Sequence, residues 1–318
     1  MTKRERVTAA FRGREADHVP VCMWQHVPQQ YWDDDDAFAE FQLNAFRSTH
    51  VDFMKLSGDK YFTWPAPALE GVKTAKELYA VEPLGPNHPF IRQQVRRAGR
   101  VVNKLGGDCV TLQLVFAPLS YLRLKVGYPA MMRLIREDPE AVKHACAAIA
   151  EDVKELAAGY INEAGVDGIF YSVQNGEVSR FTEAEYLDWV RPSDTAVLDC
   201  INRLSDMNAI HFCAWEQEPN RLSVWKDYRA AVISWSRYFD IMDIDEAKQH
   251  FGCTVWGGFD NRPGSLLYTG TKEEIEAETR ALVARGGRTG FILGADCSLG
   301  GGLDPERIRW AADEAHRV

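Results

Sequence analysis

The chain has 318 residues, a formal net charge of −9 at pH 7 and a pI near 5.5. Such an acidic chain lacks the basic face that nucleic-acid phosphates require, and no apolar run approaches the roughly 20 residues needed to cross a bilayer. The cysteines are scattered without disulfide-framework spacing and the amino terminus is polar rather than a secretion signal, so we expect a cytoplasmic protein with buried free thiols.

The first part of the chain predicts two helices and two strands. Apolar residues spaced for one helical face predict a helix over residues 2–14, and a second helix is expected over residues 37–49. The apolar, β-branched runs at residues 19–24 and 51–56 predict strands.

The region from about residue 62 to 108 is rich in proline and predicts an irregular insertion that decorates the main fold. Its end, residues 94–101, carries several arginines and is expected to form an exposed basic strand or hairpin. We interpret this basic segment as a solvated edge rather than a binding patch.

From residue 110 onward, strand-like runs alternate with helical sequence, and Asp138, Thr182 and Thr271 carry the capping signals of helix starts. The strand-like runs cover residues 110–116, 167–173, 208–213, 238–243, 253–259 and 289–295. Together with the two early strands they make eight strand–helix units, and eight such units close into a barrel. The sequence therefore predicts one α/β domain over residues 1–318, a (β/α)₈ TIM barrel with an N-terminal helix and the insertion at residues 62–108.

A candidate metal site combines His211 and Cys213 with Cys297, which follows the last predicted strand. Alternate residues of a strand face the same side, so the imidazole and the first thiol would lie together. One nitrogen and two sulfurs suit zinc, with the fourth tetrahedral position open to water or substrate. Cys297 must turn inward to join them, and the glycines at residues 300–302 are expected to permit that turn. A packed core pair is the alternative, since free cysteine behaves as a small buried hydrophobe.

Other candidates lie at the remaining predicted strand ends, where barrel enzymes carry their active sites. Glu177 is the first candidate for the fourth metal position, with a plain surface or helix-start role as the alternative. Asp296 is expected either to orient His211 or to cap the last loop. The predicted substrate-binding residues share a place at a strand end and a side chain able to contact a small ligand: Trp24, His26, Asp52, Asn175, Trp215 and Asp260.

Several motifs along the chain resemble the uroporphyrinogen decarboxylase superfamily. They are Glu163-Ala164-Gly165-Val166-Asp167-Gly168-Ile169 with Gly176-Glu177, Ile210-His211-Phe212-Cys213, Trp256-Gly257-Gly258-Phe259-Asp260 and Gly294-Ala295-Asp296-Cys297. The resemblance spans essentially the whole chain and implies a single (β/α)₈ barrel. Decarboxylases of the superfamily hold the carboxylates of their porphyrinogen with an Arg-Gln-Ala-Gly-Arg loop after the first strand, but residues 23–28 here contain no arginine.

The positions of His211, Cys213 and Cys297 resemble the other branch, the zinc-dependent corrinoid methyltransferases. The resemblance implies transfer of a methyl group between a corrinoid protein and a small thiol or methoxylated substrate, with Zn²⁺ on those three residues and a corrinoid carried by a partner protein. Two alternatives stay open: a carboxy-lyase for a less anionic acid, anchored by Asp52 or Asp59, and a non-catalytic barrel that binds a tetrapyrrole or a corrinoid. Neither nucleic acid nor a membrane is an expected partner, and a homodimer is an open alternative to a single chain.

Overall fold

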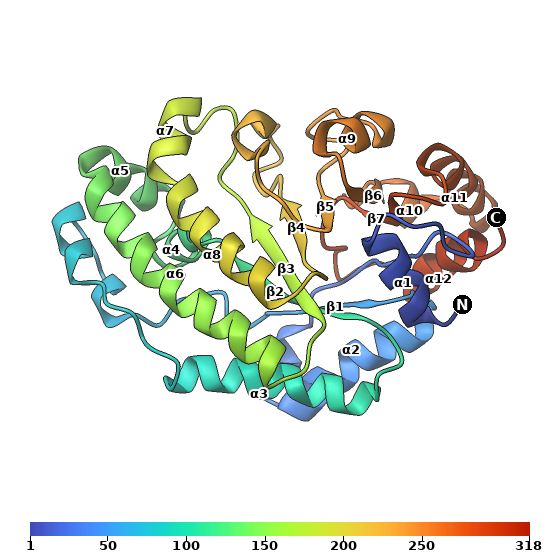
Figure 1. The fold of residues 1–318 in the computed structure, drawn as a ribbon, viewed down its shortest axis with the longest axis horizontal. Coiled ribbons are helices and arrows are strands. Elements are labelled where there is room, and N and C mark those ends of the chain that lie inside the picture. The colour runs from blue at the N-terminus through green and yellow to red at the C-terminus, as the bar shows by residue number, and fades with distance from the viewer.

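The core of the molecule is one curled sheet of seven parallel strands, arranged in sequence order from β1 to β7 (Figure 1). The computed structural model describes residues 1–318. Its strands are β1 (Met54–Leu56), β2 (Thr111–Phe116), β3 (Gly168–Val173), β4 (Ala209–Phe212), β5 (Val232–Ser234), β6 (Thr254–Phe259) and β7 (Phe291–Ala295). Their residues are almost all buried, as expected for parallel strands that are covered on both faces.

The predicted first strand is present only as a short irregular segment, which contacts both edges of the sheet. Cys22 N donates to Leu293 O of β7 at 3.0 Å, and Asp52 N, just before β1, donates to Val21 O at 2.8 Å. Gly294 lets the first segment and Trp256 pack closely against β7, because a side chain at this position would come within 2.3 Å of the Trp256 indole nitrogen and 3.0 Å of Cys22 O. The fold is therefore a TIM-like α/β fold with seven regular strands rather than the eight that were predicted.

One predicted strand was wrong in position. Residues 238–243 form turns, in which Ile241 is 83% exposed with a φ of 51°, and Asp243 is the N-cap of the following helix. The fifth strand is instead β5, where Val232 and Ile233 supply buried β-branched side chains. The sequence-based boundary failed because the strand is only three residues long and lies close to a second apolar run.

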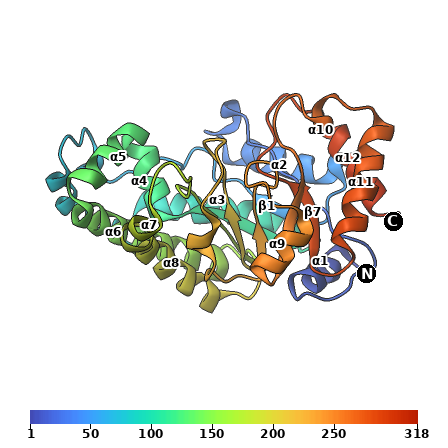
Figure 2. The same cartoon turned by 90° about the horizontal axis from the view of Figure 1, so that it is seen from above.

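Twelve α-helices surround the sheet, with α2 and α3, α6 and α8, and α11 and α12 forming packed pairs on its outside (Figures 1 and 2). The predicted starts at Asp138, Thr182 and Thr271 are confirmed as side-chain N-caps. The helices are α1 (Lys3–Phe11), α2 (Asp35–Thr49), α3 (Pro89–Leu105), α4 (Pro118–Val126), α5 (Tyr128–Glu137), α6 (Pro139–Asn162), α7 (Glu183–Trp189), α8 (Arg191–Leu204), α9 (Ile244–Phe251), α10 (Leu266–Thr269), α11 (Lys272–Gly286) and α12 (Pro305–Ala315). None of the helices combines enough length and apolar character to span a membrane.

The predicted insertion contains a regular helix. Residues 94–101, expected to form a basic strand, lie in α3, which His88 caps at its start and left-handed Gly106 ends. The arginine-rich run is helical because its apolar residues repeat on one buried face. Arg97 is buried on this face, where it pairs with Asp35 of α2 and packs over the Phe38 ring.

Helix α1 closes the end of the sheet at which the strands begin. Its Phe11 packs edge-on against Phe53 with ring centroids 6.0 Å apart, and Ala10 O accepts from the hydroxyl of Thr254, the first residue of β6, at 2.7 Å. Both chain termini lie on this side of the molecule (Figures 1 and 2). The carboxyl ends of the strands are thus left for the functional site.

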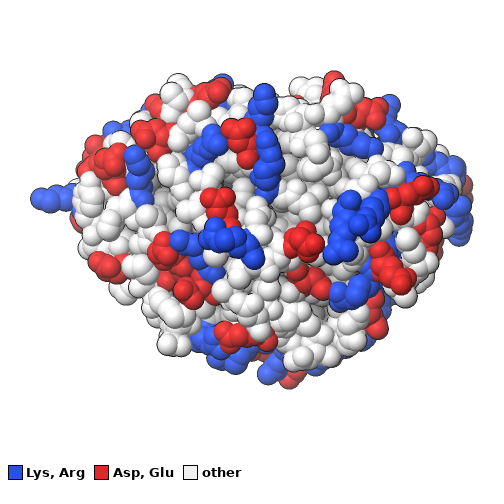
Figure 3. Space-filling view, viewed as in Figure 1, with Lys and Arg blue, Asp and Glu red and all other residues white.

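Charged side chains of both signs are interspersed over the face shown in Figure 3. Many of them form surface ion pairs, such as Arg136 with Glu185 and Arg237 with Asp243. On this face, therefore, neither sign of charge dominates.

Candidate metal centre and its cavity

Three potential metal ligands meet at the carboxyl ends of the strands. His211 lies in β4, Cys213 follows the last residue of that strand, and Cys297 lies two residues beyond the end of β7. One ligand atom from each lies within 4.8 Å of the others. Phe212, between the first two, faces the other way and stacks on Trp225 with centroids 4.4 Å apart. The alternation predicted from the sequence is therefore present, and it brings the imidazole and both thiols together.

The distances in this cluster fit a zinc ion. Two thiolates bound to tetrahedral zinc at about 2.3 Å have sulfurs about 3.8 Å apart, and the Sγ atoms of Cys213 and Cys297 are 3.8 Å apart. This separation is far too long for a disulfide, whose sulfurs are about 2.05 Å apart. The Nε2 atom of His211 is buried without a hydrogen-bond partner. A buried polar atom left unpaired is costly, so a ligand for this nitrogen explains its position.

Neighbouring side chains hold the imidazole of His211 in place. Ser234 Oγ of β5 lies 3.0 Å from Nδ1, and Phe170 stacks against the ring at a centroid distance of 5.3 Å. Asp296, one of the two sequence-based candidates for this role, does not contact the imidazole. Its carboxylate accepts instead from Ser236 Oγ at 3.0 Å and from Tyr238 N at 2.9 Å, which caps the loop after β5. These contacts join the residue after β7 to the loop after β5, which is neither of the two roles expected for Asp296.

Cys297 reaches the cluster through pairing with the irregular first segment. Leu299 N donates to Trp24 O at 2.9 Å, and Leu299 forms an isolated parallel bridge with Gln25. The glycines at residues 300–302, which were expected to permit this turn, follow the paired segment, and none of them adopts a positive φ. Backbone pairing across the closure of the sheet, rather than glycine flexibility, places the second thiol.

The two thiols influence each other strongly. Their mutual hydrogen bond lowers the pKa of Cys297 well below its usual range and, together with burial, raises the pKa of Cys213 well above it. Of the two thiols, Cys297 is therefore the one that loses its proton more readily. A metal ion would deprotonate both thiols.

The cluster lines a cavity of about 200 Å³ whose wall is mainly apolar and contains several aromatic rings. Of the predicted substrate-binding residues, Trp24, His26 and Trp215 line this cavity. Trp24 is fixed by a hydrogen bond from its indole nitrogen to Ser298 Oγ at 2.9 Å, whereas Trp215 is 51% exposed at the rim. Aromatic side chains at the mouth and within the wall therefore enclose the metal ligands.

Three other candidates lie outside the cavity wall. Asn175 is fully buried in a left-handed conformation (φ 67°) and donates to Ser120 Oγ at 3.3 Å. Glu177 is buried beside Tyr128, and burial raises the pKa of its carboxyl. Asp260 pairs with Arg262. These residues shape the loops around the site, and none of them lines the cavity that the ligand cluster faces.

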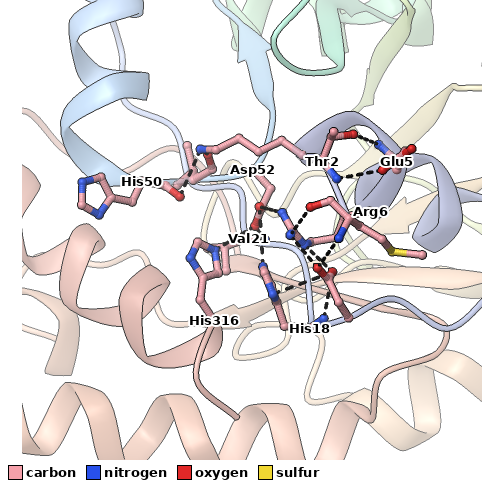
Figure 4. Close-up of polar contacts among 12 residues, drawn as sticks. Thr2, Glu5, Arg6, His18, Val21, His50, Asp52 and His316 are labelled. Atoms are coloured by element: carbon pink, nitrogen blue, oxygen red, sulfur yellow. Dashed lines mark hydrogen bonds and ion pairs between the residues drawn. The ribbon is translucent and has the colours of Figure 1, made fainter.

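The placement of Asp52 at a strand's carboxyl end was wrong. Asp52 precedes β1 and lies at the opposite, amino end of the sheet, where Arg6, His18 and His316 surround it (Figure 4). Arg6 Nη1 donates to its carboxylate at 2.8 Å and His316 Nε2 lies 3.1 Å from it. These contacts tie α1 and the residue after α12 to the start of β1, and the guanidinium already neutralises the carboxylate. The cluster lies at the opposite end of the sheet from the three potential metal ligands and does not line their cavity.

Two cavity residues that were not among the predicted site residues carry positive charge. Lys55 points inward from β1, and Arg123 reaches the cavity from α4, the helix after β2. The signal that could have identified Arg123 is a cation that directly follows the buried apolar residues of that helix, where only a buried partner or a ligand can accept its hydrogen bonds.

Comparisons with known proteins agree with the fold. The family model described as uroporphyrinogen decarboxylase (URO-D) matches residues 2–318. A methyltransferase from Methanosarcina mazei is structurally similar, with a TM-score of 0.75 and 15% sequence identity, over 100% of this chain and 99% of that chain. A B12-independent methionine synthase from a Shewanella species shows a TM-score of 0.43 and 14% identity, over 70% of this chain and 65% of that chain. A comparison with curated proteins found no significant match. On the match of its whole length, the chain belongs to the uroporphyrinogen decarboxylase family.

Proposed function

We propose that this protein is a zinc-dependent methyltransferase that moves a methyl group between a corrinoid protein and a small thiol or methoxylated substrate. The observation that carries the proposal is the meeting of His211, Cys213 and Cys297 on one cavity, with two sulfurs at the separation that tetrahedral zinc requires. The structural similarity to a methyltransferase also supports a methyltransferase function. Three protein ligands leave one position for substrate, which is the arrangement of catalytic rather than structural zinc.

Each side chain of the site has a separate task in this proposal. The three ligands would hold the zinc, which would lower the pKa of a substrate thiol or withdraw electrons from the oxygen of a methyl ether. Ser234 Oγ would accept the Nδ1 proton of His211, which would leave Nε2 free to bind. The aromatic wall, including Trp24 and Phe170, excludes water from the reacting group.

A corrinoid partner would approach at the mouth of the cavity. Four of the large hydrophobic side chains that are exposed lie in the loops that follow β3, β4 and β5, namely Val178, Trp215, Tyr238 and Ile241. Exposed apolar side chains gathered around one opening are typical of a surface that contacts another molecule. We propose that the corrinoid protein docks on this rim, where Trp215 also lines the cavity of the metal ligands.

The cavity argues against a tetrapyrrole substrate. Pockets for drug-sized molecules occupy roughly 300–1,000 Å³, and about 200 Å³ is available here. A carboxy-lyase acting on a smaller acid remains the second candidate, because the cavity carries the cations Lys55 and Arg123. That activity assigns no role to the paired thiols, which is why we place it second.

Metal analysis and methyl transfer together test the proposal. The purified protein should contain about one zinc per chain and transfer methyl groups between a methylated corrinoid protein and a thiol or a methoxylated aromatic compound. Cys213→Ala and Cys297→Ala should lose both properties. Cys146→Ala, which removes a buried thiol of α6 that is outside the cluster, should keep both. A zinc-free wild-type protein, or activity unchanged by a chelator, would refute the proposal.

A further inference from the structure

Arg123 is a buried cation without a counter-ion. Arg123 is 3% exposed, and the only hydrogen bond of its guanidinium runs from Nη2 to Gln174 Oε1 at 2.5 Å. Nε and Nη1 are buried and have no acceptor. The guanidinium lies over the Trp215 ring at 4.7 Å, on the wall of the cavity that contains the metal ligands.

The acidic residues around Arg123 do not satisfy it. Glu216 forms its ion pair with Arg180 at 3.1 Å, and Glu177 accepts from the hydroxyl of Tyr128 at 3.5 Å. Arginine stays protonated in proteins, so it cannot escape burial by losing its proton. Because an unpaired buried charge is expensive, the free guanidinium nitrogens indicate a group that arrives with a ligand.

A second cation faces the same cavity. The Nζ atom of Lys55 lies 5.6 Å from the centres of the Trp24 and Phe170 rings, and no hydrogen bond or ion pair satisfies it within the protein. No aspartate or glutamate lines the cavity. Zinc held by two thiolates and a neutral imidazole is formally neutral, so Arg123 and Lys55 would leave the loaded cavity with an excess of positive charge. Such a cavity favours an anion.

The walls and the volume limit the kind of anion. The aromatic lining consists of Trp24, Phe62, Phe116, Phe170 and Trp215. A cavity of about 150 Å³ can hold benzene, and about 200 Å³ leaves room for one ring with small substituents. Flat aromatic walls pack well against such a ring.

We infer that the substrate is a small aromatic carboxylate, whose carboxylate binds Arg123 while its ring lies between the aromatic walls and its reacting group points to His211, Cys213 and Cys297. Lys55 adds to the positive field without a defined contact. The inference rests on the proposed function for the identity of the reacting group, but the choice of an anionic aromatic ligand rests on the cavity alone.

Arg123 could instead serve only to hold Gln174 near Cys213. That structural role predicts altered zinc binding but no preference between a charged and an uncharged ligand. The inferred role predicts the reverse, namely an unchanged zinc content and a lost charge preference. A binding experiment with paired ligands therefore separates the two roles.

Isothermal titration of the zinc-loaded full chain with 4-methoxybenzoate and with 4-methoxybenzamide tests the inference. We expect the carboxylate to bind about tenfold or more tightly than the amide, the size of effect of a charged hydrogen bond. Arg123→Met should remove this preference at an unchanged zinc content, and Arg123→Lys should restore part of it. Arg262→Met removes an exposed arginine outside the cavity and should leave the preference intact.

Equal affinity of the wild-type protein for the two ligands would overturn the inference, whatever the folding of the variants. A preference that persists in Arg123→Met would overturn it as well. Zinc-dependent methyl transfer with equal affinities would refute the ligand class but keep the proposed function. A zinc-free protein that still prefers the carboxylate would refute the proposed function and support the ligand class.

Discussion

Replacing Ser234 with alanine tests which neighbour orients the metal-binding histidine. Ser234 Oγ lies 3.0 Å from Nδ1 of His211, and Nε2 is the nitrogen left without a partner. Loss of a hydrogen bond behind a metal ligand typically weakens metal binding about 10- to 100-fold. That change corresponds to about 1.4–2.7 kcal/mol of zinc-linked stability at saturating zinc.

The same loss can be expressed as a melting temperature. Unfolding entropy of about 2.1 cal/mol/K per residue gives about 0.7 kcal/mol/K for a chain of this length, which has 318 residues. Ser234→Ala should therefore reduce the zinc-dependent rise in melting temperature by about 2–4 °C relative to wild type. The zinc-dependent rise is measured within each variant, so that any change in the stability of the metal-free protein cancels.

Competition with a chromogenic chelator gives the zinc affinity directly. Asp296→Asn is the matched comparison, because asparagine keeps a carbonyl acceptor for Ser236 and Tyr238. Burial raises the pKa of Asp296 to about 8, so a neutral side chain also reproduces its charge at neutral pH. We expect zinc affinity to be unchanged in Asp296→Asn. Unaltered affinity in Ser234→Ala, or a larger loss in Asp296→Asn, would show that the imidazole is oriented in another way.

Three further predictions concern the surroundings of the site. Burial would raise the pKa of Asp52, but the nearby imidazole of His18, the hydrogen bond from His316 and the N–H of Val21 hold it below its ordinary value. Its stabilising contribution is therefore complete above the unfolded-state pKa of about 3.9 and is lost as the pH falls. Asp52→Asn should lower the free energy of unfolding by about 3–5 kcal/mol in chemical denaturation at pH 7. The loss should become progressively smaller below pH 4, and the zinc content should not change. An equal loss at all pH values would contradict the link between the protonation of Asp52 and stability. Gly176→Ala would bring a methyl group within 2.3 Å of Trp225 and should lower the free energy of unfolding by about 1–3 kcal/mol. Gly301→Ala should leave stability unchanged, because the space around Gly301 is open. Similar losses of stability in both variants would count against the packing argument. Ile241→Asp should lower kcat/KM for the corrinoid protein by about tenfold without loss of zinc, and a normal kcat/KM would exclude the rim as the docking surface.

Local patterns in the chain were sufficient for the alternation of strands and helices and for the identity of the three metal-ligand candidates. The capped helix starts at Asp138, Thr182 and Thr271 depend on side chains within three residues, and the common side of His211 and Cys213 depends on the two-residue period of a strand. Such features need no knowledge of distant contacts. The same locality explains the error at residues 238–243, where an apolar run resembled the neighbouring strand.

Contacts between distant segments decided the rest. Cys297 meets Cys213 only because the residues after β7 pair with the irregular first segment, and Asp52 belongs to the amino end because the strand begins after it, at Met54. The lack of a counter-ion for Arg123 likewise cannot be predicted from the sequence, since it depends on which carboxylates form ion pairs with other cations in the folded chain. Closure of a sheet, the direction of its strands and the pairing of buried charges are properties of the whole packed chain, and its local periodicity does not encode them.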